Sequence, residues 1–130
     1  MDARQAYALG QALQPLRDEG VLVVGSGSLT HNLYEVRLGG GPQDAEDAQY
    51  AREFAAWVRQ AVEARDDERL VDTLEIAPHA QRAHPTPEHF LPLLVAAGAA
   101  SGEKTVSTLE GGITYGVLAM DSYLFGAPTQ

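Results

Sequence analysis

Four consecutive aliphatic residues, Val21 to Val24, are followed at once by glycine, serine, threonine and histidine in the stretch VLVVGSGSLTHNL. A short aliphatic run rich in β-branched residues is typical of a strand covered on both faces, as in a parallel sheet. We therefore predict a buried strand over 21–24 that ends in a polar loop. This prediction constrains the fold strongly, because such a strand needs sheet neighbours and covering helices.

The rest of the chain alternates helical and strand-like patterns. The patterns predict an amphipathic helix over 2–18, a break at 39–42, a long helix over about 44–65, a short helix or turn over 66–76, a loop over 77–89, a helix beginning near residue 86, and strands within 104–110 and 111–126. This order predicts an α/β fold with a mixed sheet and flanking helices. The 130 residues are expected to form a single domain, 1–130.

The segment TPEHFLPLLVAAGAA has the features of a helix start. Thr86 is predicted as the N-cap and Pro87 as the first helical residue, with Glu88 in the first turn. His89 would then occupy the third helical position. Pro92 is expected to kink or delay this helix, because proline lacks the backbone N–H donor.

Composition excludes several classes of function. The net charge of -9 and the pI near 4.7 argue against nucleic acid as a partner and disfavour anionic membranes. No apolar run approaches the roughly 18 residues of a membrane span, and the first residues lack the pattern of a signal peptide. Cysteine is absent, so disulfides, thiolate catalysis and zinc-finger sites are excluded, and we expect a cytoplasmic protein.

The glycine- and serine-containing loop does not match known phosphate or nucleophile motifs. GSGSLTH is neither G-x-G-x-x-G nor a Walker loop with its lysine. A nucleophile elbow needs glycine two residues on either side of the serine, and neither Ser26 nor Ser28 has this spacing.

The four histidines are therefore the main candidates for chemistry. His31 follows the predicted strand, where open α/β sheets place their ligand crevices. His89 lies near the predicted helix start, whose positive terminus would keep the ring neutral, as a metal ligand must be. His79 and His84 lie in the preceding loop with no comparable argument. Taken singly, a histidine is more often a structural or surface residue than a catalytic one, and a metal site on His31 and His89 is one alternative.

Three separated motifs resemble the LigB-type (class III) extradiol ring-cleavage dioxygenases, in the branch that includes DOPA 4,5-dioxygenases. The motifs are GSGSLTHNL, HPTPEHFLPLLVAAGA and GGITYGVLAMDSYLFG, in that order. The resemblance extends over nearly the whole chain but matches only the C-terminal half of a typical member. It implies the C-terminal half of the LigB-type dioxygenase fold.

The resemblance also implies an activity and roles for two residues. Family members use a non-haem Fe(II), with Zn(II) sometimes found in purified preparations, to open a catechol ring next to its hydroxyls with O₂. His31 would be the catalytic acid/base close to the metal, and His89 would be a metal ligand. Three protein ligands leave open positions for a catecholate and O₂, and a histidine can pass a proton in both directions. The region of Tyr115 and Gly116 would lie on the substrate side, with no assigned role.

The sequence departs from the family in its metal ligands. The other metal histidines of the family lie in an H-G-S-P motif and a His-Trp segment of the N-terminal half, and no histidine precedes His31 here. The strand over 21–24 would also lose its sheet neighbours, so its edges would need covering by self-association or by a companion chain. The N-terminal half as a separate subunit, a truncated chain, and a stand-alone remnant are three open explanations.

Three functions remain as alternatives. The first is an extradiol dioxygenase that becomes active when the missing half completes it, with a catechol-type molecule and O₂ as substrates. The second is a non-catalytic α/β module derived from that family, which forms a homo-oligomer or binds another protein. The third is a metal-binding protein that uses His79, His84 and His89.

Overall fold

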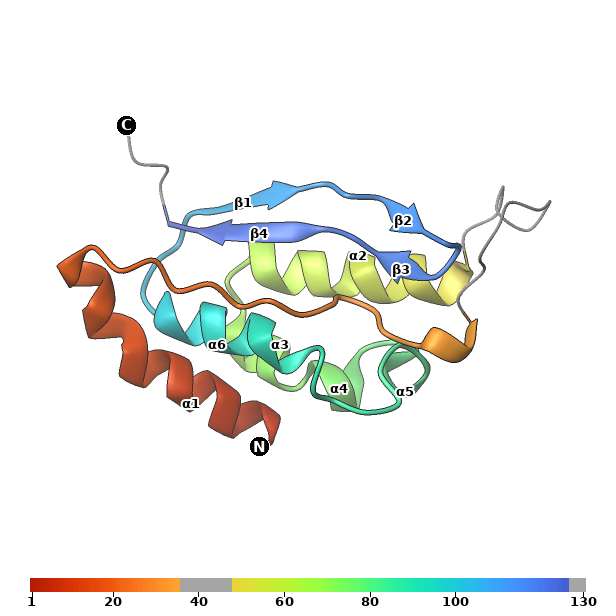
Figure 1. Cartoon of the computed structure of the whole chain (residues 1–130), viewed down its shortest axis with the longest axis horizontal. Coiled ribbons are helices and arrows are strands. Elements are labelled where there is room, and N and C mark those ends of the chain that lie inside the picture. The colour runs from red at the N-terminus through yellow and green to blue at the C-terminus, as the bar shows by residue number, and fades with distance from the viewer. Residues whose placement is uncertain (36–47, 127–130) are drawn as a thin grey trace.

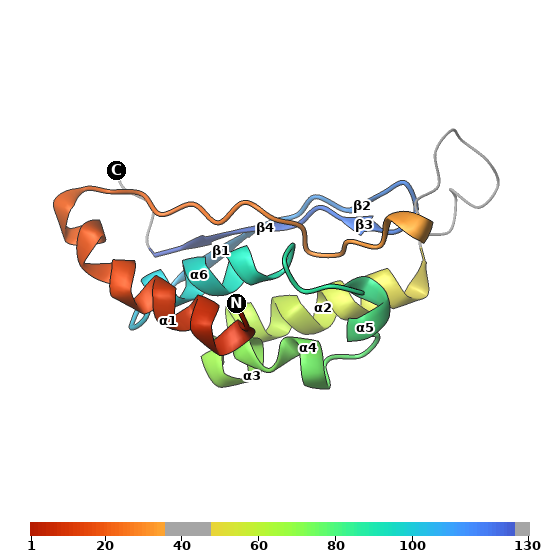
Figure 2. The same ribbon diagram turned by 60° about the horizontal axis from the view of Figure 1, so that its bottom comes forward.

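The computed structural model describes residues 1–35 and 48–126, and its helices and strands lie in layers (Figure 1). The four strands lie along one side, α2 and α6 lie next to them, and α1, α3 and α4 lie further away, as the turned view in Figure 2 also shows. In chain order the elements are α1 (Ala3–Leu13), η1 (Gln14–Glu19), η2 (Leu33–Glu35), α2 (Gln49–Glu63), α3 (Asp67–Val71), α4 (Thr73–Ile76), α5 (Ala80–Ala83), α6 (Leu91–Ala99), β1 (Val106–Leu109), β2 (Ile113–Thr114), β3 (Leu118–Ala119) and β4 (Ser122–Phe125), where η marks a 3-10 helix. The predicted α/β class is confirmed.

The N-terminal helix is confirmed, with a change of helix type near its end. Asp2 caps α1, because its side chain accepts a hydrogen bond from the backbone N–H of Gln5. Pro15 lacks the N–H that an α-helix would require, and the chain continues as the 3-10 helix η1. Gly20 ends the segment in the left-handed conformation (φ 81°) that glycine adopts without strain.

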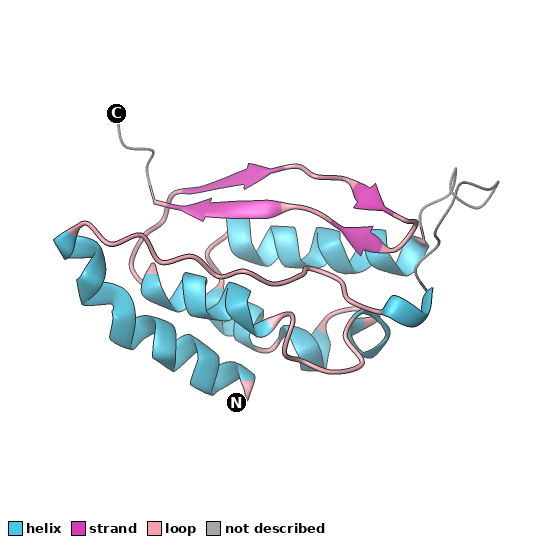
Figure 3. Cartoon of the chain, in the orientation of Figure 1, coloured by secondary structure: helices cyan, strands magenta, loops and turns pink. Residues whose placement is uncertain are grey.

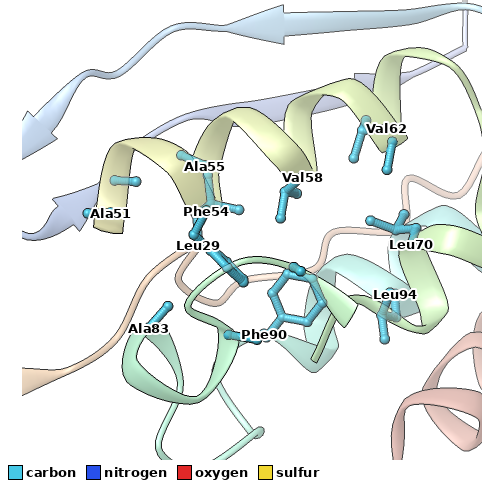
Figure 4. Packing of buried hydrophobic residues seen from close by; sticks show 14 of the residues in the cluster. Leu29, Ala51, Phe54, Ala55, Val58, Val62, Leu70, Ala83, Phe90 and Leu94 are labelled. Atoms are coloured by element: carbon cyan, nitrogen blue, oxygen red, sulfur yellow. The ribbon is translucent and has the colours of Figure 1, made fainter. Parts of the chain in front are cut away.

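The core is built around one face of α2. Its buried residues Tyr50, Phe54, Val58 and Val62 recur every four positions, as expected for one face of a helix. Figure 4 shows this face turned towards Phe90 and other buried side chains of the neighbouring elements. The predicted amphipathic helix is confirmed from Gln49 onwards, whereas its predicted beginning at 44–47 and the predicted break at 39–42 lie outside the described residues.

The C-terminal strand predictions are confirmed, but the sheets are small and antiparallel. β1 pairs with β4, with Val106 opposite Phe125, and β2 pairs with β3, with Ile113 opposite Ala119. Every strand pair in the described ranges is antiparallel, so the parallel pairing expected within a mixed sheet is absent there. The short helix or turn predicted over 66–76 is present as two short helices, α3 and α4.

The predicted buried strand over 21–24 is wrong. This segment is drawn as loop in Figure 3, and the side chains of Leu22 and Val24 are 76% and 72% exposed. A strand is defined by hydrogen bonds to a neighbouring strand, and within 1–35 and 48–126 no strand pairs with this segment. Its aliphatic side chains therefore remain exposed.

The predicted start of the next helix is also wrong. α6 begins at Leu91, and Thr86 donates a hydrogen bond to Glu88 Oε1 (2.8 Å) instead of capping a helix. A helix running from Pro87 would place Pro92 in its interior, where the missing N–H would break the ladder. Pro92 instead lies in the first turn of α6, which confirms that it delays the helix.

None of the helices in the described part of the chain is both long enough and apolar enough to cross a membrane.

Candidate functional site

The three sequence motifs meet around the loop that follows the aliphatic run. The backbone N–H of Ser28 donates to the carbonyl oxygen of His89 (2.8 Å), which joins the first motif to the second. The buried hydroxyl of Thr30 donates to the carbonyl oxygen of Val117 (2.6 Å) and accepts from the N–H of Ala119 (2.8 Å), which joins the first motif to the third. The loop is therefore held between the start of α6 and the β2–β3 hairpin.

Two glycines permit this close approach. A Cβ atom on Gly25 would overlap the carbonyl oxygen of Pro92, and a Cβ on Gly27 would overlap the carbonyl oxygen of His89 and crowd the Pro92 ring. A larger side chain at either position would push the loop away from α6. The glycines of GSGSLTH thus serve backbone packing, a role that differs from phosphate binding.

His31 and His89 lie face to face at this junction. Their ring centroids are 3.5 Å apart and the ring planes are inclined by 16°. The backbone N–H of His31 donates to the carbonyl oxygen of Ala83 (2.8 Å), and the side-chain amide of Asn32 donates to the carbonyl oxygen of Arg82 (2.9 Å). These bonds tie the loop to α5. The position of His31 is therefore set by α5, by the turn before α6 and by the β2–β3 hairpin.

His84 supports the same loop from the buried side. Its Nε2 lies 2.7 Å from the carbonyl oxygen of Leu29 and donates to it, and its ring packs between Phe54 and Phe90. Its Nδ1 is buried and has no hydrogen-bond partner. Burial lowers the pKa of His84 to about 4, with nearby His31 and His89 adding a smaller effect in the same direction, so the ring is neutral at pH 7.

The fourth histidine lies apart from this cluster. His79 Nε2 contacts Glu53 Oε2 at 2.8 Å on the surface. Within the two described ranges, no group of three His, Asp or Glu side chains is arranged so that it could hold a metal ion. The hypothesis of a metal site on His79, His84 and His89 is therefore wrong, because these three side chains do not form such a group.

The geometry of the stacked pair limits how it could bind a metal. The ligand lone pair of a histidine lies in the plane of its ring, and the nitrogen–metal distance is about 2.0–2.1 Å. Two nearly parallel rings 3.5 Å apart direct their lone pairs along separate planes, so they do not converge on one ion. At most one of the two rings can coordinate a metal in this arrangement, and the described residues alone do not fit a three-ligand centre.

His89 also borders a cleft of about 400 Å³. Its walls are the extended segment 21–29 and β4, and α6 forms its floor. Leu22, Val24, Leu93 and Phe125 are among the apolar side chains that line it. His31 does not line the cleft, so the stacked pair lies at its end with His89 on the inner side. Tyr115, in the β2–β3 turn, is half exposed and outside it.

Sequence reasoning identified His31 and His89 but missed the residues that hold them. Thr30 and His84 are both buried and connect segments far apart in the chain, a property that no local pattern reports. Gly25 and Gly27 carried a signal as glycines in a loop, but their packing partner could not be read from the sequence. The four residues together determine where the two histidines lie.

Comparison with known proteins identifies similar chains. The family described as "Catalytic LigB subunit of aromatic ring-opening dioxygenase" matches residues 1–125. A 4,5-DOPA dioxygenase extradiol from Beta vulgaris is 38% identical over 125 residues, which are 96% of this chain and 45% of that protein. A 4,5-DOPA dioxygenase extradiol from Escherichia coli K12 is 32% identical over 122 residues, which are 92% of this chain and 44% of that protein. The chain thus spans about half the length of the curated relatives it matches, and corresponds to their C-terminal half.

A solved structure shares the fold. The crystal structure of the uncharacterized protein JW3007 from Escherichia coli K12 superposes with a TM-score of 0.81 at 30% sequence identity. The match covers 98% of this chain and 51% of the other. The described fold is therefore that of about one half of a larger α/β protein.

Proposed function

Because the chain belongs to the LigB family of aromatic ring-opening dioxygenases, we propose that it is the C-terminal half of an extradiol dioxygenase that cleaves a DOPA-type catechol with O₂. The proposal is carried by one observation, the stacking of His31 on His89 where the three family motifs meet. In this proposal the other half of the dioxygenase fold completes the active site, either as a companion chain or as part of a longer polypeptide.

In the proposed active site His89 supplies one metal ligand, and the other half supplies the rest. The metal is Fe(II), with Zn(II) as an alternative occupant of purified protein. Bound at such a site, Fe(II) would lower the pKa of a catechol hydroxyl and bring the two substrates together. The stacked geometry supports a single ligand from this chain, because only one of the two rings can point its lone pair at a given ion.

His31 is the proposed acid/base. A neutral imidazole has one unprotonated ring nitrogen, which can accept a proton from a catechol hydroxyl and later return it to the opened product. The contact with His89 places His31 next to the proposed ligand, where the substrate would bind. The bonds of Thr30 to Val117 and Ala119 hold the loop that carries His31, so we infer that this geometry persists during proton transfer.

One observation favours a second function. The exposed aliphatic side chains of Leu22 and Val24 are what a non-catalytic module would use to form a homo-oligomer. In that case the chain would associate with itself and bind no metal. The same exposed surface also suits the first function, so activity after completion of the fold separates the two.

The test is reconstitution. The chain is co-expressed with the N-terminal half of the Beta vulgaris relative, loaded with Fe(II) without oxygen, and mixed with DOPA or protocatechuate in air-saturated buffer. We expect O₂ uptake and a yellow product. His89→Ala should remove both bound iron and activity, whereas His31→Ala should keep the iron and lower turnover about 100-fold or more.

His79→Ala is the matched control, since His79 is a histidine of the same chain that pairs with Glu53 away from the stacked rings. It should leave turnover unchanged. An iron-loaded complex that takes up no O₂ with any catechol would contradict the enzyme proposal and favour the second function.

A further inference from the structure

The aliphatic run lies in a long uncharged stretch of the chain. Residues 21–34 contain no Asp, Glu, Lys or Arg, although the chain has 18 acidic and nine basic residues. Within this stretch Leu22 and Val24 are 76% and 72% exposed, and Val21 is 44% exposed. Contiguous apolar side chains left open to water in this way mark a contact surface.

Within this stretch, the main chain of residues 22–27 makes no hydrogen bond to another described residue. On either side of it, the N–H of Val21 bonds to Leu16 and the N–H of Ser28 bonds to His89. Across the cleft, β4 pairs with β1 on one edge, and its other edge has no strand neighbour in the described ranges. Unpaired main-chain groups along an extended segment are a template for an added strand.

The segment is held extended rather than left loose. Its far end is fixed by the close packing of Gly25 and Gly27 on the start of α6. Its near end follows Gly20, where the 3-10 helix stops. In Figures 1 and 2 it runs as an extended stretch, drawn in orange, on the same side as the strands. An extended backbone that is already in place loses less conformational freedom when a strand pairs with it.

We propose that residues 21–27, with the cleft beside β4, form the docking surface for an apolar strand of the N-terminal half of a LigB-type dioxygenase. This inference rests on the proposed function, because it takes that half as the partner. The solved relative contains about one half of its chain beyond the matched region, and so do the curated relatives. The added strand would pair with the main chain of 22–27 and cover Leu22 and Val24, in the manner of β-strand addition.

The docking surface explains why a strand-like sequence lacks a strand. Val21 to Val24 have the composition of a strand buried on both faces, yet Leu22 and Val24 are exposed and no strand among the described residues pairs with them. Because His89 borders the same cleft, docking there would bring the N-terminal half next to the stacked histidines. The surface and the proposed metal centre would thus be completed together.

The experiment measures docking without activity. The full chain is co-expressed with a tagged N-terminal half of the Beta vulgaris relative, and the complex is analysed by co-purification and by amide hydrogen exchange. In the chain alone we expect fast exchange at 22–27. In the complex we expect a 1:1 stoichiometry and at least a tenfold slowing of exchange at these residues.

Variants locate the surface. Leu22→Asp and Val24→Asp should reduce recovery of the complex at least tenfold, because each places a charge on the surface that the added strand covers. Ile76→Asp is the matched control, since Ile76 is 55% exposed on α4, away from the cleft. Its recovery should equal that of the unchanged chain, and circular dichroism checks that all three variants fold.

Three outcomes would overturn the docking proposal. In the first, the two halves fail to co-purify. In the second, they form a complex in which the amides of 22–27 still exchange fast. In the third, the amides of 22–27 are protected from exchange in the chain alone and the protection grows with concentration, which would identify a second copy of the chain as the occupant. The His31→Ala variant keeps this test separate from the enzyme proposal. It should form the complex normally even though it removes turnover, so docking with no activity would contradict only the proposed function.

Discussion

Thr30 holds two of the three motifs together through one hydroxyl group. The side chain is completely buried, and it both donates to Val117 and accepts from Ala119. His31 is the next residue, so the direction in which its ring leaves the backbone depends on these two bonds. A serine or threonine hydroxyl is the smallest side chain that can do both, because it is a donor and an acceptor at once.

Replacing Thr30 by valine keeps the shape and removes the hydroxyl. The carbonyl of Val117 and the N–H of Ala119 would then lose their shared hydroxyl partner in the interior, so we expect the free energy of unfolding to fall by about 2–4 kcal/mol. Urea denaturation monitored by circular dichroism measures it. Thr86→Val is the control, since Thr86 is exposed, and it should change the free energy by less than about 0.5 kcal/mol. Equal effects of the two substitutions would contradict the role given to Thr30.

His84 makes the stability depend on pH. Its pKa is about 4 in the folded chain and about 6.5 when unfolded, so the unfolded chain binds an extra proton between these values. Stability contributed by His84 is therefore complete above pH 6.5 and is lost as the pH falls towards 4, by up to roughly 3 kcal/mol.

The measurement compares the unfolding free energy of the chain and of His84→Gln from pH 7 to pH 4.5. Glutamine can still donate a hydrogen bond to Leu29 but does not titrate. We expect the decrease in stability over this range to be smaller in the variant by about 1–3 kcal/mol. Identical pH profiles would show that His84 titrates normally.

Among the elements, the contact between the loop 25–32 and the start of α6 decides the geometry of the site. α6 is short and has no side-chain N-cap, and the turn before it carries His89. The loop packs on this turn through Gly27 and bonds to it through Ser28. The stacked histidines therefore depend on the close approach of two backbones, in addition to the side-chain hydrogen bonds of Thr30 and His84.

Gly27→Ala tests this contact. The added methyl group would overlap the carbonyl oxygen of His89, and relief requires the loop to move away from α6. We expect a loss of about 1–3 kcal/mol in stability and changed chemical shifts for the rings of His31 and His89. Ser26→Ala, one residue earlier and exposed, should leave both unchanged. Unaltered ring shifts in Gly27→Ala would show that the stack does not need this approach.

Taken together, the described residues form half of a site. They place one proposed ligand and one proposed acid/base in contact, yet they contain no group of three possible ligands. We therefore expect the chain alone to bind less than one equivalent of Fe(II) or Zn(II) in anaerobic equilibrium dialysis. One tightly bound equivalent that disappears in His89→Ala would contradict this, because it would require a complete centre within the chain.

The sequence was sufficient for features that depend on neighbours along the chain. The spacing of Phe54 and Val58 predicts the buried face of α2, because helical periodicity is local. The motifs around His31 and His89 name the residues that carry the proposed chemistry, because motif spacing is also local. Three-dimensional packing decided the rest. It left Leu22 and Val24 exposed, because a strand forms only when distant main chain supplies its hydrogen bonds. It also stacked His31 on His89, two residues that are more than 50 positions apart in the chain.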